Sequence, residues 1–281
     1  MTNYNKPNNK RKVMKTKEAL AVLALAFVAT GRMSLLAAET APPTSAATPS
    51  ADALLRQMSD KLGAARTFSF KARREIGSGL RGGDGLHSNS VIAVTVQRPD
   101  KVVARATLPG DVRYLYFDGK QLSMVDEQKK MYSRVPMNMS LDALPSELAT
   151  IYGFLPPVAE FLMSDLYQDL VYRAKGVEYR GTATIKTGFL GLHQVPCHRV
   201  ALTGTHADSE LWIGVDDLLP RRWDSTVKGA DGNVEIKQEL SDWNLTAKTR
   251  DEDFVFVPGK DALQIPMLTR KEMEAAHSKD K

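Results

Sequence analysis

The sequence predicts a mainly β fold of the α+β class. From about residue 67 onward, apolar and polar side chains alternate with a period of two, which is typical of antiparallel strands with one face in water. The stretches between these segments are too short for the crossover helices that a parallel sheet requires. Roughly ten or more strands with only three short helices make a large, poorly covered sheet, so we expect it to curl around the helices or to close on itself.

The N-terminal segment predicts export. Residues 1–38 contain seven Lys or Arg and one Glu, with an apolar run over residues 19–29 and small residues at Ala37 and Ala38. We therefore expect a signal peptide over residues 1–38 and an exported protein. The apolar run is shorter than the ~20 residues that span a bilayer. An uncleaved membrane anchor, lengthened by Leu35 and Leu36, remains the alternative.

Charge and cysteine content exclude two classes of protein. The chain has 38 Lys and Arg against 33 Asp and Glu, a net charge of +5. Beyond residue 38 the balance is 31 basic to 32 acidic residues, so nothing supports a nucleic-acid groove and we expect no nucleic-acid partner. Cys197 is the only cysteine, which excludes a disulfide scaffold and suits an exported protein without an internal disulfide.

The chain after the signal divides into three parts. Residues 39–50 form a Pro/Ala/Thr linker, residues 51–265 form the folded domain, and the charged residues 266–281 form a tail that we expect to be disordered. Ser50 is placed to cap a first helix and Gly63 to end it. The apolar stripe of this helix consists of Leu54, Leu55, Met58 and Leu62.

Two hairpins can be registered from the pattern. Asp118 and Gly119 are a signal for a two-residue turn, which would pair Leu115 with Leu122. The apolar face of this hairpin comprises Leu115, Phe117, Leu122 and Met124. The second hairpin turns at residues 204–207. It has an inner face of His198, Val200, Leu202, Leu211 and Ile213, with His198 opposite Ile213 and Val200 opposite Leu211, and an outer cluster of Arg199, Glu210 and Trp212.

Further elements follow from the same periodicity. We expect strands at residues 129–135, 177–186, 221–228, 234–243 and 254–257. One helical interruption lies between them, with a stripe ending at Gly153 and a second helix beginning at Pro156 and Pro157.

Three short motifs that could indicate a binding or catalytic site are better explained as structural features. The GxGxxG string at residues 77–82 has no helix after it, so we interpret it as a loop between strands rather than a dinucleotide site. His193, Cys197 and His198 lack a fourth metal ligand at suitable spacing, and we expect no metal and no cofactor. An unreactive Cys197 is favoured over a nucleophile. His198 is either a hydrogen-bonded core residue or a ligand contact.

A combination of short segments resembles a known family. These segments are VPCHRVAL (195–202), ELWI (210–213), LPRR (219–222), LSDWNL (240–245), FDGK (117–120) and MYSRVP (131–136). Together, over roughly residues 50–265, they resemble DUF2092, a bacterial periplasmic family similar to the lipoprotein-carrier (LolA/LolB-like) superfamily. The resemblance implies an unclosed antiparallel β-barrel of about 11 strands wrapped around short plugging helices, with a hollow that shelters acyl chains.

The leading hypothesis is therefore a periplasmic carrier for a lipid or an acylated protein, acting as a monomer. Its apolar hollow would lie between the sheet and the helical segment of residues 154–166. The candidate lipid-binding residues are Phe70, Val94, Leu115, Phe117, Leu122, Met124, Phe154, Phe161, Leu162, His198 and Leu211. A sensor or scaffold that binds an envelope protein through the sheet surface is the alternative, and an enzyme using Cys197 or His198 is a third possibility.

Overall fold

The computed structural model describes residues 49–77, 89–187, 193–230 and 232–279 of the 281-residue chain. All of them belong to one compact unit. The expected signal peptide, nearly all of the expected linker and most of the GxGxxG segment lie outside the described residues.

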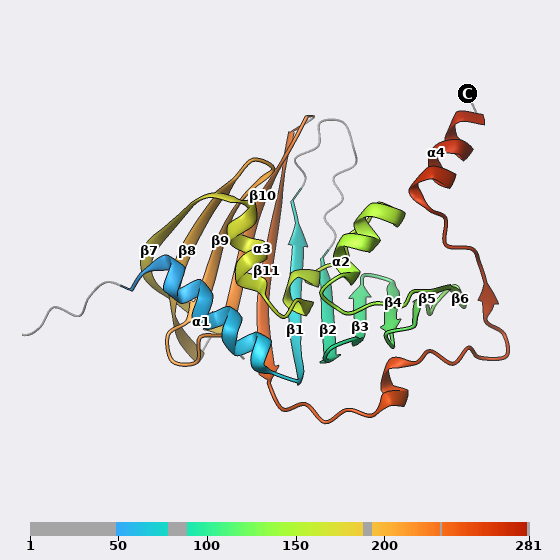
Figure 1. The fold of residues 1–281 in the computed structure, drawn as a ribbon, viewed down its shortest axis with the longest axis horizontal. Helices are drawn as coiled ribbons and strands as arrows, with labels where there is room; N and C mark the ends of the chain where they lie inside the picture. The colour runs from blue at the N-terminus through green and yellow to red at the C-terminus, as the bar shows by residue number, and fades with distance from the viewer. Residues whose placement is uncertain (1–48, 78–88, 188–192, 231, 280–281) are drawn as a thin grey trace, which may run out of the picture. The chain divides into compact units, whose positions relative to one another are not determined.

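The strands of the described residues form one 12-stranded sheet, and its order is β12-β6-β5-β4-β3-β2-β1-β11-β10-β9-β8-β7 (Figure 1). Neighbouring strands are antiparallel except for the short parallel pair of β12 and β6. The strands are β1 (Thr67–Ile76), β2 (Ser90–Gln97), β3 (Lys101–Leu108), β4 (Asp111–Phe117), β5 (Gln121–Asp126), β6 (Met131–Pro136), β7 (Ala174–Thr187), β8 (His193–Gly204), β9 (Ala207–Gly214), β10 (Pro220–Gly229), β11 (Gly232–Asn244) and β12 (Leu263–Gln264). Since β12 and β7 do not pair, the predicted mainly β, unclosed antiparallel architecture is confirmed.

Short helical segments pack on the inner face of this sheet (Figure 1). They are α1 (Ala51–Ala64), α2 (Leu144–Glu147), the π-helical turn η1 (Leu148–Tyr152), the 3₁₀ turn η2 (Ala159–Leu162) and α3 (Leu166–Arg173). Two later elements lie on either side of β12 in the chain, the 3₁₀ turn η4 (Asp251–Phe254) before it and α4 (Arg270–Lys279) after it. Helix α4 occupies much of the segment for which we expected no regular structure. No helix in the described part of the chain is both long and apolar enough to cross a bilayer.

Helix α1 begins as expected and ends one residue later than expected. The side chain of Ser50 accepts a hydrogen bond from the backbone N–H of Ala53, and the apolar stripe is buried. Gly63 lies inside the helix, where an added Cβ would collide with the backbone oxygen of Ser164. This glycine therefore permits a close approach between α1 and the chain before α3, and does not serve as a helix stop.

The first hairpin has the predicted face but not the predicted register. Leu115 pairs with Met124, two residues from the expected partner Leu122. The carboxylate of Asp118 accepts hydrogen bonds from the N–H groups of Lys120 and Gln121, at 2.9 and 2.7 Å. The turn is consequently centred on Gly119 and Lys120, with the positive φ of 86° at Gly119. Because the shift is an even number, the apolar face is preserved.

The second hairpin has the predicted register. His198 pairs with Ile213, Val200 with Leu211, and Leu202 with Ser209. Apolar residues alternate clearly on both strands here, so a slip by one residue would expose the whole inner face.

Two predicted elements are wrong. Residues 254–257 do not form a strand. They leave η4 in an extended segment in which the ring of Phe256 packs on Tyr116 and Tyr132, with ring centroids 5.7 and 5.2 Å apart. No helix begins at Pro156, because Val158 adopts a left-handed φ of 58° and interrupts the chain direction.

Candidate functional site

Most of the residues that sequence analysis proposed for lipid binding lie in the packed core. Buried among them are Phe70, Val94, Leu115, Phe117, Leu122, Phe161, Leu162 and Leu211. Met124, Phe154 and His198 are half-buried. Only about 20 Å³ of space remains between these strands and the helical segment, beside Val94, Leu115 and Leu162. The role of these residues in lipid binding therefore stays a prediction.

An aromatic cluster fills the centre of this core. The ring of Phe161 on η2 lies 5.8 Å from Phe70, 5.5 Å from Trp223 and 6.0 Å from Trp243, in edge-to-face geometry. Phe70 also stacks on Trp243 at 4.5 Å. Edge-to-face and offset pairs of this kind stabilise aromatic cores beyond the area they bury. The cluster fixes η2 against the sheet and makes it one wall of the adjacent space.

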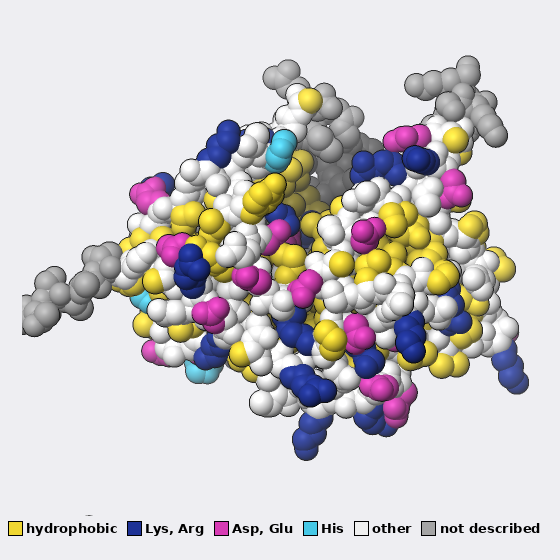
Figure 2. Space-filling model, viewed as in Figure 1, with side chains coloured by type: hydrophobic (Ala, Val, Ile, Leu, Met, Phe, Trp, Pro, Cys, Tyr) yellow, Lys and Arg dark blue, Asp and Glu magenta, His cyan; other side chains and the backbone are white. Residues whose placement is uncertain are grey.

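A larger cavity lies beside the cluster, over strands β8 to β11. Its volume is about 580 Å³, within the ~300–1,000 Å³ typical of small-molecule sites. Segment 155–158, η2 and α3 form one side, and the inner face of the sheet forms the other. In the space-filling view the surface is hollowed between the α3 and α2 regions, with hydrophobic and charged side chains on the walls (Figure 2).

The cavity wall is largely apolar. It includes Leu155, Pro156, Pro157, Val158, Leu170, Tyr172, Leu202, Val227 and Ile236. Leu155, Tyr172 and Val227 are exposed, with Tyr172 exposed by 92%. Large apolar side chains that are exposed to water around a concave site are a feature of binding surfaces rather than of a core.

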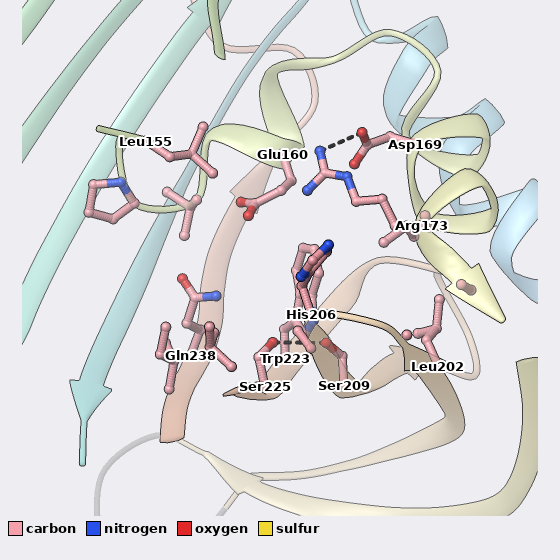
Figure 3. Close-up of a pocket in the computed structure, with 18 of the residues that line it drawn as sticks. Leu155, Glu160, Asp169, Arg173, Leu202, His206, Ser209, Trp223, Ser225 and Gln238 are labelled. Carbon is pink, nitrogen blue, oxygen red and sulfur yellow. Dashed lines mark hydrogen bonds and ion pairs between the residues drawn. The ribbon is translucent and has the colours of Figure 1, made fainter. Parts of the chain in front are cut away.

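Polar groups are concentrated at the inner end. Glu160 on η2 and Gln238 on β11 point into the cavity from opposite sides (Figure 3). Arg173 and Asp169 on α3 form an ion pair at 2.5 Å, and the hydroxyl groups of Ser209 and Ser225 are 3.0 Å apart on the floor.

The carboxyl group of Glu160 is in an unusual environment. Its Oε2 atom is buried and has no hydrogen-bond partner among the described residues. Burial raises the pKa of Glu160 above its ordinary value, and the positive charges of Arg173 and Arg74 offset this only in part. The site therefore favours the neutral acid.

Sequence reasoning missed the polar residues of this cavity. Arg74 follows Phe70 and Ala72 at even spacing, which places it on the inner face of β1. Gln238 lies between Ile236 and Leu240 at the same parity on β11. A charged or amide side chain at an inward position of an alternating strand was the available signal, because such a side chain needs a partner.

Cys197 and His198 do not form part of the cavity. The Cys197 thiol is fully buried, and burial raises its pKa to about 11. His198 Nδ1 lies 3.0 Å from the hydroxyl group of Tyr179 on β7. Within the described ranges, no three His, Cys, Asp or Glu side chains lie together in a way that would hold a metal ion.

The expected outer cluster is present on the opposite face of the sheet. Arg199 makes a bidentate pair with Glu210, both bonds at 2.9 Å, and lowers the pKa of that carboxyl. The guanidinium groups of Arg199 and Arg222 lie 5.1 and 5.5 Å from the Trp212 ring. A second, open hollow of about 590 Å³ borders Arg199, Glu210 and Arg222.

The described residues thus form an open sheet with helices on one face and a partly apolar cavity between them. The profile of the DUF2092 family, described as predicted periplasmic proteins, matches residues 51–268, and the chain belongs to this family. None of the curated proteins compared matches the chain.

Distant similarities to solved structures were also found. A DUF1329 family protein from Desulfovibrio piger is 11% identical over 73% of this chain and 95% of its own, with a TM-score of 0.35. A LolA superfamily protein from Nitrosomonas europaea is 10% identical over 74% of this chain and 99% of its own, at 0.33. The Pseudomonas aeruginosa MucA/MucB complex contains a chain 15% identical over 74% of this chain and 61% of its own, at 0.38.

Proposed function

We propose that this protein is a periplasmic carrier or binding protein that holds a lipid, or the acyl group of a lipid-modified protein, in the cavity under α3. The observation that carries the proposal is the cavity of about 580 Å³ with apolar walls and exposed Leu155, Tyr172 and Val227 at its rim. Each CH₂ group buried there would contribute ~0.8 kcal/mol, so binding needs no catalytic group. The family's description as periplasmic supports the compartment.

The wall of the cavity is suited to opening. Segment 155–158 lies between Gly153, which has a positive φ of 74°, and the anchored end of η2. The same segment borders both the large cavity and the small space beside Val94 and Leu115. Displacement of Pro156 to Val158 would join the two spaces and lengthen the room for a chain.

The proposal is tested by filling the cavity. Ser225 lies on the floor, and its neighbour Thr226 points to the opposite face of β10. Protein purified from the periplasm is delipidated, its extract is analysed by mass spectrometry, and uptake of a fluorescent fatty acid is measured. We expect Ser225→Trp to abolish uptake and co-purifying lipid, and Thr226→Trp to retain both. Absence of lipid and uptake in the unmodified protein would contradict carriage.

A second candidate function rests on the outer cluster. Trp and Arg are the residues most enriched at the energetic centres of protein interfaces, and Trp212 lies between two arginines there. A sensor or scaffold would bind an envelope protein through this face. Loss of a periplasmic partner in pull-downs with Trp212→Ala, but not with Ser225→Trp, would favour this function over carriage.

A further inference from the structure

Three polar side chains form a row across the floor of the cavity. Arg74 on β1 is paired in register with Gln238 on β11, and Gln238 is paired with Trp223 on β10. Directly paired residues have Cβ atoms about 5 Å apart, so the three side chains are immediate neighbours. All three line the cavity. Gln238 and Trp223 lie across the cavity from Glu160 on η2 (Figure 3).

The hydrogen-bond donors of this row are not satisfied within the described part of the chain. Trp223 is 7% exposed, and its Nε1 atom is buried with no hydrogen-bond partner. Gln238 is also 7% exposed, and its side chain makes no hydrogen bond to a described residue. Arg74 makes neither a hydrogen bond nor an ion pair there, and only a longer-range Coulombic interaction with Glu160. Trp223 Nε1 is the donor of the row that is both buried and unpaired among the described residues. Buried donors in native proteins are nearly always paired, so Trp223, with Gln238 and Arg74 beside it, indicates a site for an acceptor.

Arg74 is the one cation of the row, and it has no direct ion-pair partner among the described residues. Arg173 is neutralised by Asp169. Glu160 acts on Arg74 only through a longer-range Coulombic interaction, and no carboxylate among the described residues forms an ion pair with Arg74. Desolvation also lowers the pKa of Arg74, which reports a cation in an unfavourable environment. An anionic acceptor would relieve both the unpaired donors and the unpaired charge.

We infer that the cavity takes an amphiphile with a terminal oxyanion, a carboxylate or a phosphate, bound by Arg74, Gln238 and Trp223. Its apolar body would lie along Leu170 and Ile236. The inference rests on the proposed function and narrows it: free anionic lipids such as fatty acids are bound in preference to the uncharged acyl chains of a lipoprotein.

A ligand series on the unmodified protein tests the inference without dependence on any variant. Hexadecanoate, hexadecyl phosphate, hexadecanol and methyl hexadecanoate share a chain and differ in the head group. We expect the two anions to bind at least about tenfold tighter than the two neutral ligands, since hydrogen bonds to charged groups are the stronger class. Whichever of hexadecanoate and hexadecyl phosphate binds more tightly identifies the head group, carboxylate or phosphate, that the site prefers. Equal binding of all four ligands would overturn the inference and leave the proposed function standing, whereas no binding of any would overturn both.

Substitutions then test which residues cause the tighter binding of anionic ligands. Arg74→Met should lower hexadecanoate affinity to that of hexadecanol and leave hexadecanol affinity unchanged, and Trp223→Phe should lower hexadecanoate affinity several-fold. Arg73→Met is the matched control, because Arg73 is the exposed neighbour on the outer face of β1. Thermal unfolding establishes that each variant is folded. An undiminished preference for the anion in folded Arg74→Met would contradict the assignment of the row.

Discussion

The guanidinium group of Arg98 donates a hydrogen bond to the backbone oxygen of Leu162 at 2.5 Å. Its second terminal nitrogen donates to the oxygen of Met163 at 2.9 Å. Arg98 follows β2, whereas the two carbonyl groups end η2, the turn that carries Glu160 and Phe161. One side chain therefore links the far end of a strand to the wall of the cavity.

Removal of this link should loosen that wall. We expect Arg98→Met to lower the free energy of unfolding by about 2 kcal/mol, since two charge-assisted bonds are lost and two carbonyl groups lose their donor. Amide hydrogen exchange should accelerate in residues 155–163 and remain unchanged in α1. Uniform acceleration over the whole domain would show that Arg98 acts on global stability only.

Substitutions in the core and at the cavity rim should have different consequences. Phe117→Ala removes a fully buried ring and should lower the free energy of unfolding by about 3–5 kcal/mol. Leu155→Ala, at a side chain 43% exposed, should change it by less than about 1 kcal/mol while weakening fatty-acid uptake. Denaturant unfolding and uptake assays measure the two effects. Reduced stability without reduced uptake in Leu155→Ala would remove Leu155 from the binding surface.

The raised pKa of Glu160 predicts a pH dependence of stability. The folded protein holds this proton more tightly than the unfolded chain, so stability is lost as pH rises from the ordinary pKa of Glu toward the raised value. Glu160→Gln should remove this loss and raise the melting temperature at neutral pH relative to the unmodified protein. Glu75→Gln, at an exposed outer position, is the control and should leave the pH profile unchanged.

Cys197 should be unreactive in the folded protein. Only the thiolate attacks alkylating reagents, and a thiol with a pKa of about 11 is almost wholly protonated at pH 8. We expect iodoacetamide to label Cys197 in denaturant and not in the native state, as followed by intact mass. Rapid native labelling would reopen the nucleophile hypothesis.

The C-terminal segment should protect one edge of the sheet. The N–H groups of Leu263 and Ile265 donate to the backbone oxygens of Lys130 and Tyr132, at 2.9 and 2.8 Å, and so cover β6. Exposed edges pair with other chains. A chain ending at residue 258 should therefore self-associate in light scattering, whereas Leu263→Ala, which keeps the backbone bonds, should not. If light scattering gives the mass of a monomer for the shortened chain, the β12 segment is not required to prevent association through β6.

The sheet was predictable where the inner and outer faces differ strongly. His198 to Leu202 and Ser209 to Ile213 alternate so clearly that their register followed from the pattern. The register of the first hairpin differed from the prediction, because hydrogen bonds to the side chain of Asp118 move the turn by one residue. The alternation of apolar and polar residues carries no information about such a bond.

The cavity was less predictable than the sheet. Its floor joins Arg74 to Gln238 and Trp223, which are far apart in the sequence and meet only through strand order. Its roof depends on the left-handed φ of Val158, a conformation that β-branched residues rarely adopt and that no local pattern indicates. Sequence analysis proposed a hollow lined by residues such as Leu115, where about 20 Å³ of space is present, and did not identify the larger cavity beside it.

The central claim is that an acyl chain occupies the cavity under α3, and photo-crosslinking tests it most directly. A fatty acid with a diazirine in its chain is bound, irradiated, and mapped by peptide mass spectrometry. We expect labels on Leu155, Leu170 and Ile236, all lost in Ser225→Trp. Labels confined to the Arg199 and Trp212 face, or labels that persist in Ser225→Trp, would contradict the account.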